Sequence, residues 1–347
     1  MSTPDRHAYS DPSVLDAELT HLFSRRMYAG SVFDVSQVND YRSFLMGPRA
    51  ITVRNTGNGI RAFNNVCLHR NALIDPVGSG NRAFRCNYHG WSYDGDGSLK
   101  NAPLAEDVTI CERKLAGVPV SLVQGLCFLG WDGRPEVSGI EAALSETNIV
   151  PAAPFHREAL DHACNWKLLV ENVLEGYHLS YVHQSTFLPA GFSSTASYEV
   201  ANLGDVSWGK LTPTPKNDKS KAMQRLSPDA GHFYHHVYIF PDLFLSSTNG
   251  LIGFQSHLRP VHASRTLLEW SLFELPALAR LPASIREQVK ADAVQFTNAA
   301  LREDQVLVES CQLGLSAIGP NIQLQPSESR IQHFHDLYRE RMPHVVR

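Results

Sequence analysis

Two short segments, Cys67-Leu68-His69 and Cys86-Asn87-Tyr88-His89, decide how this sequence is interpreted. Each segment holds one Cys and one His, and sixteen residues separate the two. A set of two thiolates and two imidazoles binds either zinc or an iron–sulfur cluster. Zinc-finger spacings usually place both Cys in one segment and both His in the other. The mixed order therefore favours a [2Fe–2S] cluster in which two His replace two Cys on one iron, and a structural zinc site is the alternative.

The residues after His89 are rich in turn formers. They run Gly90-Trp91-Ser92-Tyr93 into Asp94-Gly95-Asp96-Gly97, which is typical of a loop that closes tightly around a cluster. The order Cys-x-x-His-Gly-Trp resembles the second cluster arm of the Rieske non-heme iron oxygenases. Neither arm holds the additional Cys that forms a disulfide in the Rieske proteins of respiratory complexes, so the resemblance is to the oxygenase branch. The resemblance implies that the cluster is bound by Cys67, His69, Cys86 and His89.

The first arm departs from this family at one position. The family often continues His-Arg-Gly there, and in this chain Asn71 follows Arg70. Asn is the next most tolerant residue of a left-handed turn after Gly, so we expect the arm to keep its shape.

A second motif lies between Asn165 and His183, in the order Asn-Trp-Lys-Leu-Leu-Val-Glu-Asn-Val-Leu-Glu-Gly-Tyr-His-Leu-Ser-Tyr-Val-His. Asn165 is a good helix N-cap, and apolar residues recur at helical spacing after it, so a helix is predicted from this point. On such a helix Glu175 and His178 would share a face. His183 can join them only if the helix bends, bulges or ends between the two His.

Two imidazoles and one carboxylate form the facial triad of mononuclear non-heme Fe(II), whose open positions admit O₂. The segment resembles the family motif Glu-Asn-…-Asp/Glu-x-x-His-x-x-x-x-His. By that resemblance His178 and His183 bind the iron, and Glu175 is the residue that bridges the two metal centres. Asp is commoner at this last position, and Glu resembles the branch of the carnitine and betaine-type oxygenases. Taken alone, either His would be interpreted as an ordinary hydrogen-bonded imidazole, and the histidines outside both motifs are interpreted in that way.

The resemblance implies that the third iron ligand is a carboxylate from elsewhere in the chain. A long helix is predicted from about residue 285 to 313, and it contains Glu303 and Asp304. In the family, a Glu-Asp pair followed by an apolar helix and Gln-x-Gly-Leu provides this ligand, and Gln312-Leu313-Gly314-Leu315 fits. The resemblance therefore implies Asp304. Glu303 is the competing neighbour, and the alternative is that both are solvated helix charges.

The composition predicts a compact enzyme. The 347 residues are 43% hydrophobic and 19% charged, which suffices for the cores of two domains. The net charge of −4 argues against nucleic acid as a partner. No apolar run approaches a membrane span and the first residues lack the core of a signal peptide, so we expect a cytoplasmic protein. The remaining cysteines are expected to be buried thiols: Cys111, Cys127, Cys164 and Cys311.

Periodicity predicts an α+β protein. After a helix at about 13–26, short strands are expected at 51–54, at 60–64, around Phe84 and at 125–131, as in a small β-sandwich. The looser segment 133–139 suggests a boundary between a cluster domain, residues 1–138, and a catalytic domain, residues 139–347.

Strand-like runs at 234–246, 251–258 and 266–275 precede the long helix, which predicts helices on one face of an antiparallel sheet. The resemblance implies the helix-grip fold for this domain. The polar, Pro-containing segment 212–221 is expected to form a flexible loop over the pocket.

Together these features predict the terminal oxygenase component of a Rieske-type system. The expected cofactors are a Rieske [2Fe–2S] cluster and a mononuclear Fe(II), and the expected substrates are O₂ and a small organic molecule. Hydroxylation, demethylation and oxidative cyclisation all remain open, and the chain length favours monooxygenation over dioxygenation.

The chain has no nucleotide fingerprint, so electrons must come from a separate reductase, with or without a ferredoxin. Its docking surface is predicted to include Arg70, Arg82 and Arg85, which the alternative places on an ordinary solvated face. The family resemblance implies a homotrimer with electron transfer between neighbouring subunits. The alternative function is a non-catalytic Rieske electron carrier fused to a ligand-binding domain.

Overall fold

The computed structural model describes residues 4–105, 112–214, 221–222, 225, 233–317 and 322–343. The chain forms two compact units. The cluster-arm unit is Leu19–Val137, and the sheet unit comprises the described residues up to Glu18 together with those from Ser138 onward. The functional domains 1–138 and 139–347 stay a prediction, because packing alone does not show where a function begins.

The described residues of the cluster-arm unit form three antiparallel sheets, as the alternating apolar strands predicted. One sheet has the order β1-β10-β9, formed by Met27–Ser31, Leu126–Leu129 and Val120–Val123. A second has the order β5-β2-β3-β4-β8, formed by Gly78–Asn81, Asp40–Met46, Arg49–Asn55, Ile60–Asn64 and Gly117–Val118. The third pairs β6 (Ser92–Tyr93) with β7 (Leu99–Asn101). Phe84 lies outside these strands, so the strand expected there is wrong.

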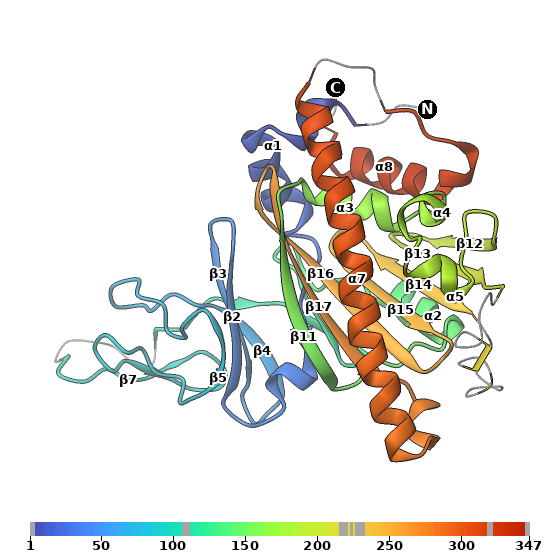
Figure 1. Ribbon diagram of the computed structural model, residues 1–347. Coiled ribbons are helices and arrows are strands. Elements are labelled where there is room, and N and C mark those ends of the chain that lie inside the picture. The colour runs from blue at the N-terminus through green and yellow to red at the C-terminus, as the bar shows by residue number, and fades with distance from the viewer. Residues whose placement is uncertain are drawn as a thin grey trace. The chain divides into compact units, whose positions relative to one another are not determined.

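In the part of the sheet unit that the structure describes, seven strands form one antiparallel sheet (Figure 1). Its order is β11-β17-β16-β15-β14-β13-β12, so the last six strands of the chain form a meander and β11 joins its far edge. The strands are β11 (Pro154–His162), β12 (Ser197–Leu203), β13 (Val206–Thr212), β14 (Tyr234–Ile239), β15 (Leu243–Thr248), β16 (Ile252–His262) and β17 (Arg265–Glu274). The run predicted at 234–246 is therefore a hairpin rather than one strand. Pro241 and Asp242 lie in its turn, where the missing N–H of proline is tolerated.

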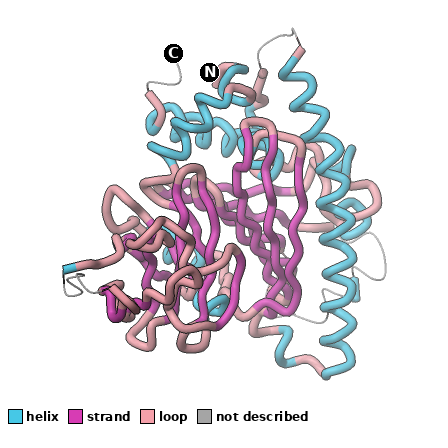
Figure 2. The backbone as a smooth tube through the Cα atoms, turned by 90° about the vertical axis from the view of Figure 1, so that its left-hand side faces the viewer, coloured by secondary structure: helices cyan, strands magenta, loops and turns pink. Residues whose placement is uncertain are grey.

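The helices of the sheet unit are α1 (Pro12–Ala17), α2 (Ser138–Glu146), α3 (Trp166–Val173), α4 (Leu179–Val182), α5 (Phe187–Ala190), α7 (Ala283–Ser316) and α8 (Ser329–Arg341). Short 3-10 helices occur at Arg6–Tyr9, Val32–Val35, Leu278–Arg280 and Pro326–Glu328. The long helix α7 runs along the sheet, and Figure 2 shows the helix beside the strands. It confirms the helix predicted at 285–313. No described helix has both the length and the apolar character needed to cross a membrane.

Expectations for the N-terminal helix and for one of the remaining cysteines differ from the structure. The N-terminal helix predicted for 13–26 ends earlier, because α1 passes into a π-helical turn at Glu18–Leu22. Cys127 and Cys164 are buried, but Cys311 is exposed on α7, so the buried-thiol expectation is wrong for Cys311. Cys111 and most of the loop expected at 212–221 lie outside the described residues.

Candidate metal centres

The two cluster arms fold in the same way. In the first arm the N–H of Asn71 donates to the carbonyl of Cys67 (3.1 Å), and in the second the N–H of Gly90 donates to the carbonyl of Cys86 (3.1 Å). The residue that closes each turn is left-handed, with φ of 56° at Asn71 and 76° at Gly90. Asn71 thus takes the conformation that the sequence required of it, since Asn tolerates this region better than other side chains.

The four predicted cluster residues divide into two buried thiols and two exposed imidazoles. Cys67 and Cys86 are 1% and 2% exposed, and burial raises the pKa of the Cys86 thiol. His69 and His89 are exposed, and their Nδ1 atoms face each other at 3.1 Å. This is a suitable set for a binuclear cluster, with sulfur ligands on the inner side and imidazole ligands on the outer side.

Two aromatic residues support the arms, and sequence reasoning gave neither a role. The Tyr93 hydroxyl donates to the Sγ of Cys67 (3.2 Å) and accepts from the N–H of Leu68 (3.1 Å). The Trp91 ring stacks on His69, with centroids 4.9 Å apart and planes 7° from parallel. Hydrogen bonds to ligand sulfurs and packing of ligand rings tune such clusters.

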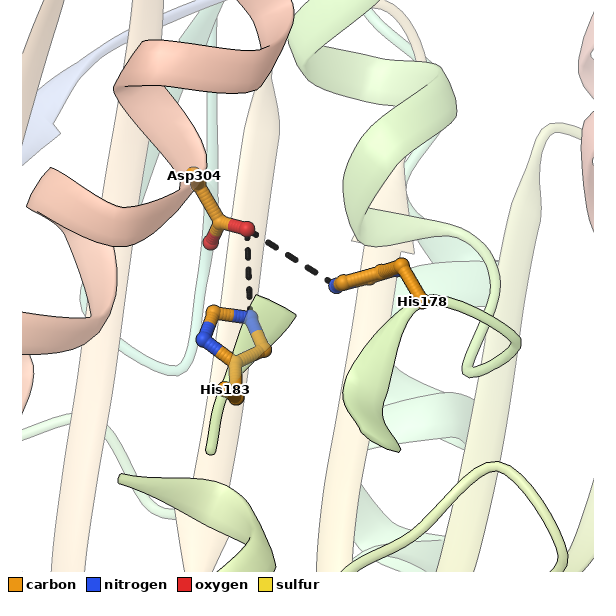
Figure 3. Close-up of side chains that lie close together, drawn as sticks. All are labelled: His178, His183 and Asp304. Carbon is orange, nitrogen blue, oxygen red and sulfur yellow. Dashed lines mark ion pairs between the residues drawn. The ribbon is translucent and has the colours of Figure 1, made fainter. Parts of the chain in front are cut away.

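A second centre is formed by His178, His183 and Asp304 (Figure 3). Oδ1 of Asp304 lies 3.1 Å from Nε2 of His183 and 3.7 Å from Nε2 of His178. Among the described residues this is the only group of three or more His, Cys, Asp or Glu whose ligand atoms all converge in this way. Two imidazoles and one carboxylate are the donor set that suits mononuclear Fe(II).

Each His of this triad is held from behind by a further carboxylate. His178 Nδ1 contacts Oε1 of Glu175, and His183 Nδ1 lies 2.8 Å from Oε2 of Glu303. Since each Nδ1 faces a carboxylate, each Nε2 is left free to point toward Asp304. Glu303 and Asp304 are neighbours in α7 with different contacts. Asp304 faces both Nε2 atoms, and Glu303 faces Nδ1 of His183.

Glu303 has three side-chain partners, although the sequence predicted only a competing iron ligand or a solvated helix charge. It accepts hydrogen bonds from the hydroxyls of Ser185 and Thr186 in addition to its contact with His183. Burial acts against its charge, but these hydrogen bonds prevail and lower the pKa of the Glu303 carboxyl. The nearby hydroxyls in Gln184-Ser185-Thr186 were the only sequence signal that could have revealed this role.

The local chain path differs from the predicted helix. Asn165 caps α3 as expected, because its side chain accepts from the N–H of Lys167 (3.0 Å). However, α3 ends at Val173, and Glu175 and His178 lie in the turn that follows, so their expected position on a helix is wrong. The turn brings them together because the Glu175 carboxylate accepts the N–H of His178 (3.2 Å). The short helix α4 then separates His178 from His183.

The triad lines a cavity of about 390 Å³ between α7 and the sheet. Helix α7 contributes residues at helical spacing, and the strands contribute alternate residues, as expected for elements that face each other. The wall near His183 is aromatic: Phe187 lies 4.9 Å from His183 by ring centroids, and it contacts Phe296 and Tyr234 at 5.0 and 5.7 Å. The cavity can therefore hold a small, largely apolar molecule beside the triad.

Two family models match this chain, one over each of the parts that hold the candidate centres. The model of the Rieske [2Fe-2S] domain matches residues 27–112, and that of the ring hydroxylating alpha subunit (catalytic domain) matches residues 151–344. Chloroplastic choline monooxygenase from Beta vulgaris is 28% identical over 96% of this chain and 75% of its own length. The toluate 1,2-dioxygenase alpha subunit of Pseudomonas putida is 30% identical, over 51% of this chain and 44% of its own length.

Solved structures show the same fold. A quaternary ammonium Rieske monooxygenase, CntA, superposes with a TM-score of 0.82 at 21% identity, covering 98% of this chain and 95% of that protein. A naphthalene 1,2-dioxygenase superposes with a TM-score of 0.74 at 18% identity, covering 99% and 92%.

The fold and the two centres define a Rieske non-heme iron oxygenase. The chain belongs to the ring-hydroxylating alpha-subunit family. It is an oxidoreductase that acts as a terminal oxygenase, and its cofactors are a Rieske [2Fe–2S] cluster and a mononuclear iron. The alternatives of a structural zinc site and of a non-catalytic electron carrier are therefore wrong.

Proposed function

We propose that this enzyme is a monooxygenase that oxidises a C–H bond of a small organic molecule in the cavity, with iron held by His178, His183 and Asp304. The main support is the convergence of two Nε2 atoms and one carboxylate oxygen in the wall of a 390 Å³ cavity. Oδ1 of Asp304 is a buried atom without a hydrogen-bond donor among the described residues, as expected of a metal ligand. Bound there, the iron supplies O₂ activation at its open positions.

In this proposal the cluster is held by Cys67, His69, Cys86 and His89. The buried thiols and the facing Nδ1 atoms support that assignment. Glu175 is proposed as the bridging residue: it orients His178 and connects it to a cluster His of a neighbouring subunit. The structure of a quaternary ammonium Rieske monooxygenase is described as giving insights into inter-subunit electron transfer, which supports the same route in an oligomer here. The homotrimer is part of the proposal.

Electrons would come from a separate reductase, with or without a ferredoxin. The proposed docking surface includes Arg70 and Arg85, which are exposed beside the arms. Arg82 contributes to the surface less directly, because its guanidinium donates to the carbonyls of Ile74 (2.9 Å) and Arg85 (2.7 Å) and so ties the arms together. A cytoplasmic location stays a prediction, and the choline monooxygenases among the relatives are described as chloroplastic.

The cavity residues would exclude water from the reaction. The aromatic rings of Phe187, Tyr234 and Phe296 make this part of the cavity wall largely apolar. Because such rings replace few of the hydrogen bonds of bulk water, an apolar substrate group fits beside the triad. The first compounds to assay are those in the names of the relatives, namely choline, L-carnitine, gamma-butyrobetaine, toluate, biphenyl and naphthalene.

The test is a turnover assay with heavy-isotope O₂, a surrogate reductase and this substrate panel. We expect one labelled oxygen atom in the product, together with iron beyond the two atoms of the cluster in the pure enzyme. Two labelled atoms in one product would mean a dioxygenase, and absence of the additional iron would refute the proposed triad.

A further inference from the structure

One residue of the cavity wall has a hydrogen-bonding atom without a partner among the described residues. His236 on β14 lines the cavity and is 3% exposed, yet its Nε2 has no partner among the described residues. Ring contacts connect it to the triad through Tyr234 (6.2 Å) and Phe187 (5.7 Å from Tyr234). A buried imidazole that leaves one nitrogen unpaired is unfavourable, so this atom requires an explanation.

The other nitrogen of His236 fixes its protonation. Nδ1 lies 3.1 Å from a guanidinium nitrogen of Arg330 on α8, a side chain that is 1% exposed. A guanidinium can only donate hydrogen bonds, so Nδ1 must be the acceptor and the proton must be on Nε2. His236 therefore presents an N–H donor on its unpaired side.

Arg330 cannot easily turn away from this contact. Its guanidinium also donates to the hydroxyl of Ser207 (2.9 Å), to the carbonyl of Ser207 (3.2 Å) and to the hydroxyl of Tyr198 (2.6 Å). These four contacts hold the guanidinium in one orientation behind the cavity wall.

The groups that accept hydrogen bonds from Arg330 are uncharged. Among the described residues no carboxylate lies within ion-pair distance of it. Burial, with help from the Arg330 charge, places the pKa of His236 well below its usual range, so the ring stays neutral at physiological pH. Arg330 therefore adds positive charge behind this part of the cavity wall, and the cavity lining also includes the carboxylates of Glu175, Asp292 and Asp304.

We propose that His236 is a specificity-determining residue whose Nε2–H binds a carboxylate or carbonyl oxygen of the substrate. This inference rests on the proposed function and adds the chemical class of the substrate: a small molecule with an acceptor oxygen at one end and an oxidisable C–H group at the other. Arg330 acts as a positioning residue, because it sets the tautomer of His236 and adds positive charge without reaching the substrate.

The test uses three probes of similar size in the anaerobic holoenzyme, so that no turnover occurs. Benzoate has an anionic acceptor, acetophenone has a neutral acceptor, and ethylbenzene has none. By calorimetric titration we expect benzoate or acetophenone to bind about tenfold more tightly than ethylbenzene, the difference expected from one good hydrogen bond in a buried site. The tighter of the two oxygen-containing probes identifies which acceptor the site prefers.

His236→Phe should remove this preference and leave affinities within about twofold of each other, because the donor is lost while the ring remains. His236→Gln, which keeps an N–H donor, should retain part of it. The matched control is Phe244→Leu: Phe244 lies 5.5 Å from His236 in the same wall, and its replacement should weaken all three probes alike.

Equal affinities in the wild-type enzyme would overturn the proposal whether or not the variants fold, and so would an undiminished preference in His236→Phe with normal metal content. Failure of the proposed monooxygenase function is distinguishable, because it would appear in iron content and oxygen incorporation, which this titration does not measure.

Discussion

Asp304 and Glu303 are adjacent acids with opposite orientations, and this separates their expected roles. Asp304→Ala should remove the mononuclear iron and leave the colour of the cluster, because it deletes one of three proposed ligands. Glu303→Ala should keep the site but weaken iron binding by about 10–100-fold, as for other residues that orient a ligand His. Iron titration of the two variants decides between them. If Glu303→Ala loses all mononuclear iron while Asp304→Ala keeps it, the proposed third ligand is off by one residue.

Glu175 is the position at which this chain differs from the commoner Asp. Its carboxylate contacts Nδ1 of His178 without facing the triad's shared centre, so Glu175→Gln should leave both metals at normal occupancy. Reoxidation of the reduced cluster with substrate and O₂ present should nevertheless slow by about 100-fold, since the charge that positions His178 is gone. A stopped-flow single turnover measures this directly. Reoxidation at the wild-type rate would show that Glu175 is only a structural carboxylate.

Helix α3, which precedes the turn with Glu175 and His178, is fixed by a buried ion pair. Lys167 Nζ lies 2.6 Å from Oε1 of Glu18, and both side chains are fully buried. The hydroxyl of Tyr338 on α8 donates to the same carboxylate (2.5 Å), as does the indole N–H of Trp166 (2.8 Å). The segment near the N-terminus, α3 and α8 are thus joined through one acid.

Lys167→Met should destabilise the sheet unit by about 3–5 kcal/mol, because it leaves the Glu18 charge buried without its cation. The double variant with Glu18→Gln should recover part of that loss. Lys290→Met is the matched control, since Lys290 pairs with Glu274 and Glu287 nearer the surface and should contribute about 1 kcal/mol or less. Denaturant unfolding followed by near-ultraviolet circular dichroism compares them. Equal losses at positions 167 and 290 would contradict this account.

Elements with a strong local signal could be predicted from the sequence, and elements fixed by distant contacts could not. The periodicity before Asp304 gave α7, and the N-cap at Asn165 gave the start of α3. The end of α3 at Val173 did not follow, because the turn after it depends on the carboxylate of Glu175. The role of His236 was equally hidden, since Arg330 is distant in sequence and only the fold brings the two together.

At the scale of the whole molecule, the two centres draw their residues from different units. Cys86 belongs to the cluster-arm unit, and the triad belongs to the sheet unit. Cys86→Ser should therefore abolish the visible absorption of the cluster and leave the mononuclear iron largely bound. Absorption spectroscopy with metal analysis checks both parts. A normal Rieske spectrum in this variant would refute the cluster assignment.

The placement of the proposed ligands along the chain sets an order for biosynthesis. All four cluster residues lie between positions 67 and 89, so a ribosome makes them well before it reaches His178, His183 and Asp304. The iron triad is complete only when Asp304 has been synthesised, long after His178 and His183. At about 5–20 residues per second, that interval lasts several seconds or more. A nascent chain could thus begin to acquire its cluster during translation, whereas the mononuclear iron can be held by the complete triad only after Asp304 has been made.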